Sequence, residues 1–142
     1  QLKKEFVSEY EKRKYRAKLF PETIDILDRL LKNNIGLSVL SASNQNTLND
    51  LIQYYSIAGF FQHIVGVNNY IADGKIQQGI KLLDSIDSNK TDLLMIGDTN
   101  LDYAVSQELG IDCVLISQGH QSIKQLELCN NTIIQSFDVL FK

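Results

Sequence analysis

Residues 92–102, with the sequence DLLMIGDTNLD, decide the fold of this chain. Four apolar residues in a row are typical of a strand buried on both faces, and Gly97 lets the chain turn where that strand leaves the sheet. Asp98 and Asp102 follow, one helical turn apart, and the helix that begins here is predicted to end at Gly110. Ligands of open parallel sheets gather at the carboxyl ends of the strands, so both carboxylates are predicted to face one crevice.

The composition is that of an ordinary globular protein of one domain. The 142 residues are 44% hydrophobic and 22% charged, and the net charge of −3 gives no case for nucleic-acid binding. The sequence has no apolar run of about 18 residues and opens on a polar, charged segment, so we expect no membrane contact and a cytoplasmic location. Cys113 and Cys129 are too few for a metal site or a disulfide framework, and Cys113 is expected to be buried.

The positive charge is concentrated at the start of the chain. Residues 1–18 hold seven of the 14 basic side chains and three acidic ones, which leaves seven basic and 14 acidic side chains, a net charge of −7, for the rest. Two interpretations stay open: a basic segment that attracts an anionic substrate, and the solvated face of a charged helix over residues 2–18. Leu2, Phe6 and Tyr10, at a spacing of four, predict one narrow apolar stripe on that helix.

Strands and helices are predicted to alternate along the rest of the chain. Short apolar runs predict strands at residues 35–40, 63–67, 93–96, 112–117 and 132–134. Helices are predicted before and between these strands, at residues 23–32, 45–55, 76–83, 103–109 and 123–128. This alternation favours right-handed crossovers and a parallel sheet with helices on both faces, an α/β fold of the Rossmann-like three-layer sandwich type.

Polar side chains are predicted at the carboxyl ends of three strands. Ser41 opens one polar segment, Lys75 follows the next strand, and Asp98 with Asp102 follows the third. Hydroxyls and the N–H groups of a helix start bind phosphate oxygens, an ammonium group neutralises them, and carboxylates bind Mg²⁺. This division of labour is what phosphoryl transfer requires, so a phosphate and a divalent cation are the expected ligands.

These motifs resemble those of the haloacid dehalogenase-like hydrolase superfamily, in its phosphoglycolate-phosphatase-like and phosphomutase-like branch, over about residues 21–122. Residues 37–41 look like the second motif of that family, which implies that Ser41 hydrogen-bonds the transferring phosphoryl group, with Ala42 and Ser43 beside it. Residues 72–75 look like the third motif, which implies that Lys75 steadies both the phosphate and the nucleophile. Lys81 is the competing lysine and is expected to face solvent.

Residues 97–102 look like the fourth motif, which implies that Asp98 binds Mg²⁺ and that Asp102 supports the metal shell or pairs with Lys75.

The first motif, Asp-x-Asp after a first strand, has no counterpart before Ser41. That strand lies in the middle of the family's sheet, so its absence implies a gap with unpaired backbone groups. We therefore expect an upstream segment that carries the nucleophile, with residues 1–18 as the end of a helical cap and residues 19–142 as a core lacking its first strand.

The resemblance implies a Mg²⁺-dependent phosphatase that acts on a small phosphorylated metabolite through an aspartyl phosphate. A non-catalytic α/β binding module, or degenerate relative, and a sugar phosphomutase stay open as alternatives. An incomplete sheet also allows self-association with a neighbouring copy.

Helix capping stays open as a structural role for several of these residues. Asp98 or Thr99 could cap the helix that follows them, and Ser43 or Asn44 is a candidate cap for the helix after residue 44. His120 is a further residue that could lie at the edge of the pocket.

Overall fold

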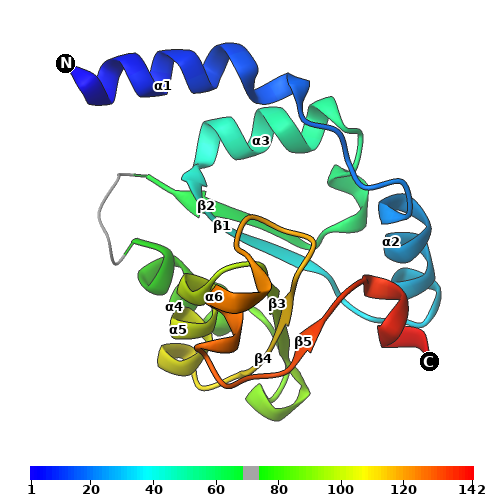
Figure 1. The fold of residues 1–142 in the computed structure, drawn as a ribbon. Coiled ribbons are helices and arrows are strands. Elements are labelled where there is room, and N and C mark those ends of the chain that lie inside the picture. The colour runs from blue at the N-terminus through cyan, green and yellow to red at the C-terminus, as the bar shows by residue number, and fades with distance from the viewer. Residues whose placement is uncertain (69–73) are drawn as a thin grey trace. The chain divides into compact units, whose positions relative to one another are not determined.

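The computed structural model describes residues 1–68 and 74–142, which form two compact units, Gln1–Gln78 and Gly79–Lys142. Each unit has its own parallel sheet with helices packed against it (Figure 1). Helix α4 (Gly74–Ser85) begins in the first unit and ends in the second. Within the described ranges, every helix is too short or too polar to cross a membrane.

Helix α1 (Leu2–Arg13) opens the first unit and ends in a 3-10 helix (Lys14–Arg16), so the predicted helix over residues 2–18 is shorter than expected. The structure describes all of α1, and none of its residues is buried. The predicted apolar stripe therefore faces solvent, with Leu2 exposed to 84% and Phe6 to 74%. Helix α2 (Thr23–Lys32) has the predicted bounds.

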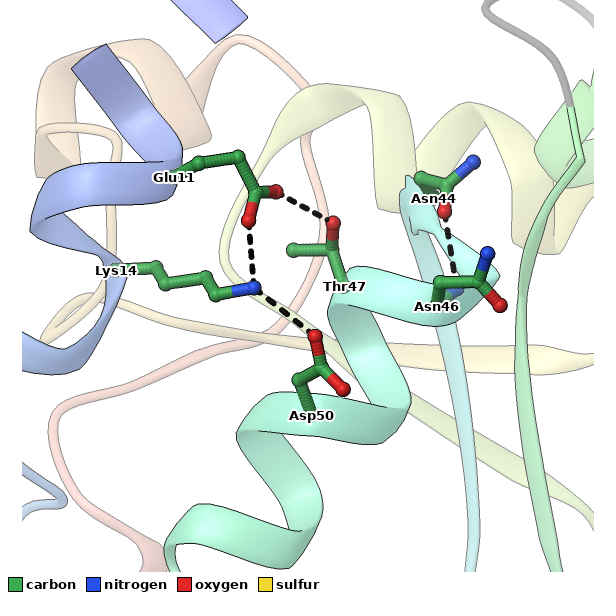
Figure 2. A network of polar contacts seen from close by, with 6 residues as sticks. All are labelled: Glu11, Lys14, Asn44, Asn46, Thr47 and Asp50. Carbon is green, nitrogen blue, oxygen red and sulfur yellow. Dashed lines mark hydrogen bonds and ion pairs between the residues drawn. The ribbon is translucent and has the colours of Figure 1, made fainter. Parts of the chain in front are cut away.

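A polar network connects the end of α1 to helix α3 (Gln45–Tyr54), as Figure 2 shows. Lys14 Nζ lies 2.6 Å from a carboxylate oxygen of Glu11 and 3.1 Å from one of Asp50, and Thr47 Oγ1 donates to Glu11 at 2.8 Å. The Lys14 side chain is only 5% exposed, so its charge depends on these carboxylates. Hydrogen bonds to Glu11 and Asp50 raise the pKa of Lys14, and the bond from Lys14 lowers the pKa of Glu11.

Strands β1 (Ser38–Asn44) and β2 (His63–Val67) form the parallel sheet of the first unit. Strand β1 begins and ends later than the predicted residues 35–40, whereas β2 has the predicted bounds. Asn44 Oδ1 accepts a hydrogen bond from Asn46 N–H at 2.9 Å and so caps α3, as one of the two candidate residues was expected to do (Figure 2). Helix α3 packs against both strands, over a core of three buried side chains, Leu48, Ile52 and Ile57.

Strands β3 (Leu94–Gly97), β4 (Asp112–Ile116) and β5 (Ile133–Ile134) form the parallel sheet of the second unit, in that order. Helix α5 (Asn100–Leu109) packs against β3 and β4. Cys113, Leu115 and Leu126 form one buried cluster in the core of this unit, and Val105 and Leu109 of α5 are buried as well. Both cysteines are free thiols, and the expected burial of Cys113 is confirmed.

Helix α5 ends at Gly110, whose φ of 68° is left-handed, as the sequence predicted. Helix α6 (Ile123–Glu127) follows β4 and is capped by Ser122, which accepts a hydrogen bond from Gln125 N–H at 3.4 Å. Further 3-10 helices lie at Ala58–Phe60, Lys90–Asp92 and Phe137–Phe141.

Candidate functional site

Of the two predicted metal-binding carboxylates, Asp98 lies in the loop between β3 and α5, whereas Asp102 lies in the first turn of α5 and shapes that loop. Asp102 Oδ2 accepts hydrogen bonds from the N–H groups of Asp98 and Thr99, each at 3.0 Å, and from Thr99 Oγ1 at 2.9 Å. Thr99 Oγ1 accepts a bond from Asp102 N–H at 3.3 Å, which completes a capping box. Thr99 and Asp102 together therefore cap α5, and Asp98 lies just before the cap residue Thr99.

Gly97 is required by the close approach of Asp102. A Cβ atom at position 97 would lie 2.2 Å from Asp102 Cβ and 2.7 Å from its Oδ2. Gly97 does not have a positive φ, so a left-handed backbone is not what requires glycine at this position. The glycine makes room for the carboxylate that organises the loop.

Asp98 is half-buried and is held by a second loop, residues 117–122, which follows β4. Asp98 Oδ2 accepts a hydrogen bond from the backbone N–H of His120 at 2.7 Å. A Cβ atom at Gly119 would lie 2.1 Å from Asp98 Cβ, so only glycine allows this approach. Since β3 and β4 are neighbouring parallel strands, both loops lie at the carboxyl edge of the same sheet.

Residues 41–43, predicted to bind phosphate after the end of a strand, instead form a bulge inside β1. The register between β1 and β2 places these three residues opposite one residue of β2, Gly66. Ser41 Oγ accepts a hydrogen bond from Ser43 N–H at 3.1 Å. A hydroxyl that accepts this bond still has its own hydrogen to donate, so Ser41 can donate to a phosphate oxygen. Ala42, between them, is exposed.

The side chain of Gln45 replaces the backbone pairing that the bulge interrupts. Its Oε1 accepts from Gly66 N–H at 2.7 Å, and its Nε2 donates to Ile64 C=O at 3.0 Å and to Asn49 Oδ1 at 2.9 Å. A Cβ atom at Gly66 would lie 2.7 Å from Ser43 C=O, so glycine is required there too. Sequence reasoning missed Gln45, because its partners become apparent only once the register of the sheet is known.

Replacing Gln45 with alanine is expected to destabilise the chain by about 1–3 kcal/mol, because the buried Gly66 N–H and the Ile64 C=O lose their partner. Urea unfolding of the 142-residue chain measures this change. Gln53→Ala is the control, since Gln53 is exposed on the same helix. Equal unfolding midpoints for the two variants would show that the Gln45 amide does not support the bulge.

Lys75 lies in the first turn of α4 and is buried, with an exposed fraction of 8%, whereas Lys81 is exposed, as expected. The preceding part of the third motif, Ala72 and Asp73, lies outside the described residues. The structure thus places Lys75 and residues 41–43 in the first unit, and brings Asp98 and Asp102 together in the second.

The two carboxylates of the second unit offer the hard oxygen ligands that Mg²⁺ prefers. The two carboxylates differ in their remaining capacity to bind a metal, because Asp102 Oδ2 already accepts three hydrogen bonds and Asp98 Oδ2 accepts one. Across the described ranges there is no group of three or more acidic, histidine or cysteine side chains that could hold a metal. The pair therefore fits part of the shell of a Mg²⁺ that also keeps water or takes ligands from elsewhere.

Several solved structures share the fold of this chain, among them the following three. A predicted phosphatase from Clostridium acetobutylicum is 21% identical with a TM-score of 0.78, over 87% of this chain and 58% of that one. A haloacid dehalogenase-like family hydrolase from Streptococcus pneumoniae is 25% identical with a TM-score of 0.73, over 89% and 60%. Protein Tyrosine Kinase A from Mycobacterium tuberculosis is 19% identical with a TM-score of 0.77, over 95% and 65%. These likenesses confirm the predicted Rossmann-like α/β fold.

This chain spans less than two thirds of the length of each of these three structures. No curated protein sequence matches it. The family model described as haloacid dehalogenase-like hydrolase matches residues 1–116, most of the chain. The predicted resemblance is thereby confirmed, and the chain belongs to the haloacid dehalogenase-like hydrolase family.

Proposed function

We propose that this chain supplies the phosphate- and metal-binding groups of a Mg²⁺-dependent phosphatase that acts on small phosphorylated metabolites. The observation that carries the proposal is the fixed place of Asp98, directly after β3, with its N–H bonded to Asp102 and its carboxylate bonded to His120 N–H. A carboxylate held from two loops at the carboxyl edge of a parallel sheet is pre-organised to bind a cation.

In this proposal each residue has a separate task. Asp98 would hold Mg²⁺ directly, and Asp102 would support the metal shell by fixing the loop through its Oδ2. Ser41 donates its hydroxyl hydrogen to the phosphoryl group, with Ala42 and Ser43 beside it in the bulge, and the ammonium of Lys75 neutralises phosphate charge. Bound Mg²⁺ would stabilise the negative charge that develops on the transferring phosphoryl group.

The nucleophile is proposed to be an aspartate on a strand upstream of Gln1, which forms the aspartyl phosphate. The described strands form two separate sheets, β1–β2 and β3–β4–β5, and the further strand that the family's sheet contains is proposed to belong to that upstream segment. The same reasoning assigns residues 1–18 to the end of a cap and residues 19–142 to the core. We also propose a cytoplasmic location, and self-association through the open edges of the sheets.

Hydrolysis of p-nitrophenyl phosphate with Mg²⁺ tests the proposal, in the 142-residue chain and in a version extended upstream. We expect activity in the extended version alone, and loss of that activity when Mg²⁺ is removed by EDTA. An extended protein that binds phosphate and metal without hydrolysis would instead identify a binding module. Transfer of phosphate between two positions of a sugar phosphate would identify a phosphomutase.

A further inference from the structure

Two amide side chains join the loop after β3 to the loop after β4. Gln121 Oε1 accepts a hydrogen bond from Asn100 N–H at 2.7 Å, and Gln121 Nε2 donates to Asn100 Oδ1, also at 2.7 Å. Asn100 is the first residue of α5, so its N–H has no partner within the helix. Gln121 therefore satisfies a helix-start donor and closes a two-bond ring between the loops.

This amide pair lies next to Asp98 on both loops. Asn100 is two residues after Asp98, and Gln121 directly follows His120, whose N–H donates to Asp98 Oδ2. The bond from His120 distinguishes the two oxygens of the Asp98 carboxylate, because it engages Oδ2 alone. The donor, His120 N–H, belongs to the loop after β4, which Gln121 connects to Asn100. Oδ1 would then be the freer of the two oxygens for a cation, because Oδ2 already accepts one hydrogen bond.

We infer that Gln121 is a positioning residue for Asp98: it fixes the loop after β4 so that His120 N–H engages Oδ2 and Oδ1 is presented to a divalent cation. The inference rests on the proposed metal-binding role of Asp98. Gly119 supports it, because a side chain at that position would push the loop away from Asp98. Groups that orient a metal ligand typically change metal affinity by about 10–100-fold when they are replaced.

Three substitutions separate positioning from a general effect of loop mutation. Gln121→Ala removes both bonds to Asn100. Gln121→Glu retains an acceptor for Asn100 N–H, and its second oxygen can accept from the Asn100 amide after that amide rotates by half a turn. Gln118→Ala is the matched control, since Gln118 is exposed in the same loop.

The test is an NMR titration of the 142-residue chain with Mn²⁺, whose paramagnetism broadens the amide signals near the bound ion. We expect half-saturation at about 10-fold higher Mn²⁺ for Gln121→Ala than for the unchanged chain. Gln118→Ala should leave half-saturation unchanged, and Gln121→Glu should restore it. Amide exchange at Asn100 and His120 should speed up in Gln121→Ala, which reports the loss of the loop contact without any metal.

The outcomes for Gln121 and for the proposed reaction are distinguishable. If Gln121→Ala binds Mn²⁺ as tightly as the unchanged chain does, Gln121 does not position Asp98, whatever the activity of the extended protein. If the extended protein hydrolyses no phosphomonoester while Gln121→Ala still weakens Mn²⁺ binding, the proposed reaction fails and the positioning role of Gln121 stands.

Discussion

In the version of the protein extended upstream of Gln1, Asp98→Asn is expected to lower Mg²⁺-dependent hydrolysis of p-nitrophenyl phosphate by more than about 10²-fold. Replacing a group that merely orients a metal ligand typically costs about 10–100-fold, so neutralising the ligand itself should cost at least as much. Asparagine has nearly the size of aspartate, and its amide oxygen can still accept from His120 N–H. The loss is therefore expected from the missing charge and not from a collapsed loop.

Asp112→Asn is the matched control for Asp98→Asn. Asp112 is exposed at the amino end of β4, whereas Asp98 follows the carboxyl end of the neighbouring parallel strand β3. Neutralising Asp112 should leave the activity within about twofold, because surface substitutions away from a site rarely exceed about 0.5 kcal/mol. If Asp98→Asn retained more than a tenth of the activity, direct metal binding by Asp98 would be ruled out.

The largest expected effect on stability comes from Gly97→Ala, which should destabilise the 142-residue chain by about 2–4 kcal/mol. The atom nearest to the added methyl group is Asp102 Cβ, at 2.2 Å, and no change of rotamer moves a Cβ atom. Either the end of β3 or the first turn of α5 must shift, which breaks the hydrogen bonds from Asp98 and Thr99 to Asp102. Urea unfolding measures the difference.

Gly59→Ala serves as the control for Gly97→Ala. A Cβ atom at Gly59 would meet no atom within 4 Å, and Gly59 does not have a positive φ. Alanine there should be neutral or stabilising by up to about 1 kcal/mol, because it restricts the unfolded chain. Equal unfolding midpoints for the two variants would mean that Asp102 does not approach Gly97 as closely as the structure describes.

The structural places of the candidate site residues were predictable where they depend on a local sequence signal. An acid directly after an apolar strand and a glycine located Asp98, and a second acid one turn later located Asp102. The predicted places of Asn44 as a helix cap and Gly110 as a helix end are confirmed, because both depend on the backbone within a few residues. The close approach of Asp102 to Gly97 was not predicted, because it depends on a side chain that folds back onto the strand.

Contacts between distant residues were not predictable. Lys14 looked like one more cation of a solvated helix, yet it is buried against Asp50, which is 36 positions away. Gln45 and Gln121 looked like ordinary polar residues, although each joins segments about 20 positions apart. Nothing in the sequence around them marks a partner, because a single glutamine fits almost any polar setting.

The sequence by itself determined the alternation of strands and helices, the bounds of β2 and α2, and the family, since these follow from periodicity, caps and the order of motifs along the chain. Tertiary structure alone decided that residues 41–43 form a bulge, that Gln45 bonds to Gly66 of β2 and that Gln121 bonds to the start of α5. The physical reason is that helix and strand signals depend on neighbouring backbone geometry, whereas a side chain that repairs a sheet or joins two loops acquires its partners from the strand register.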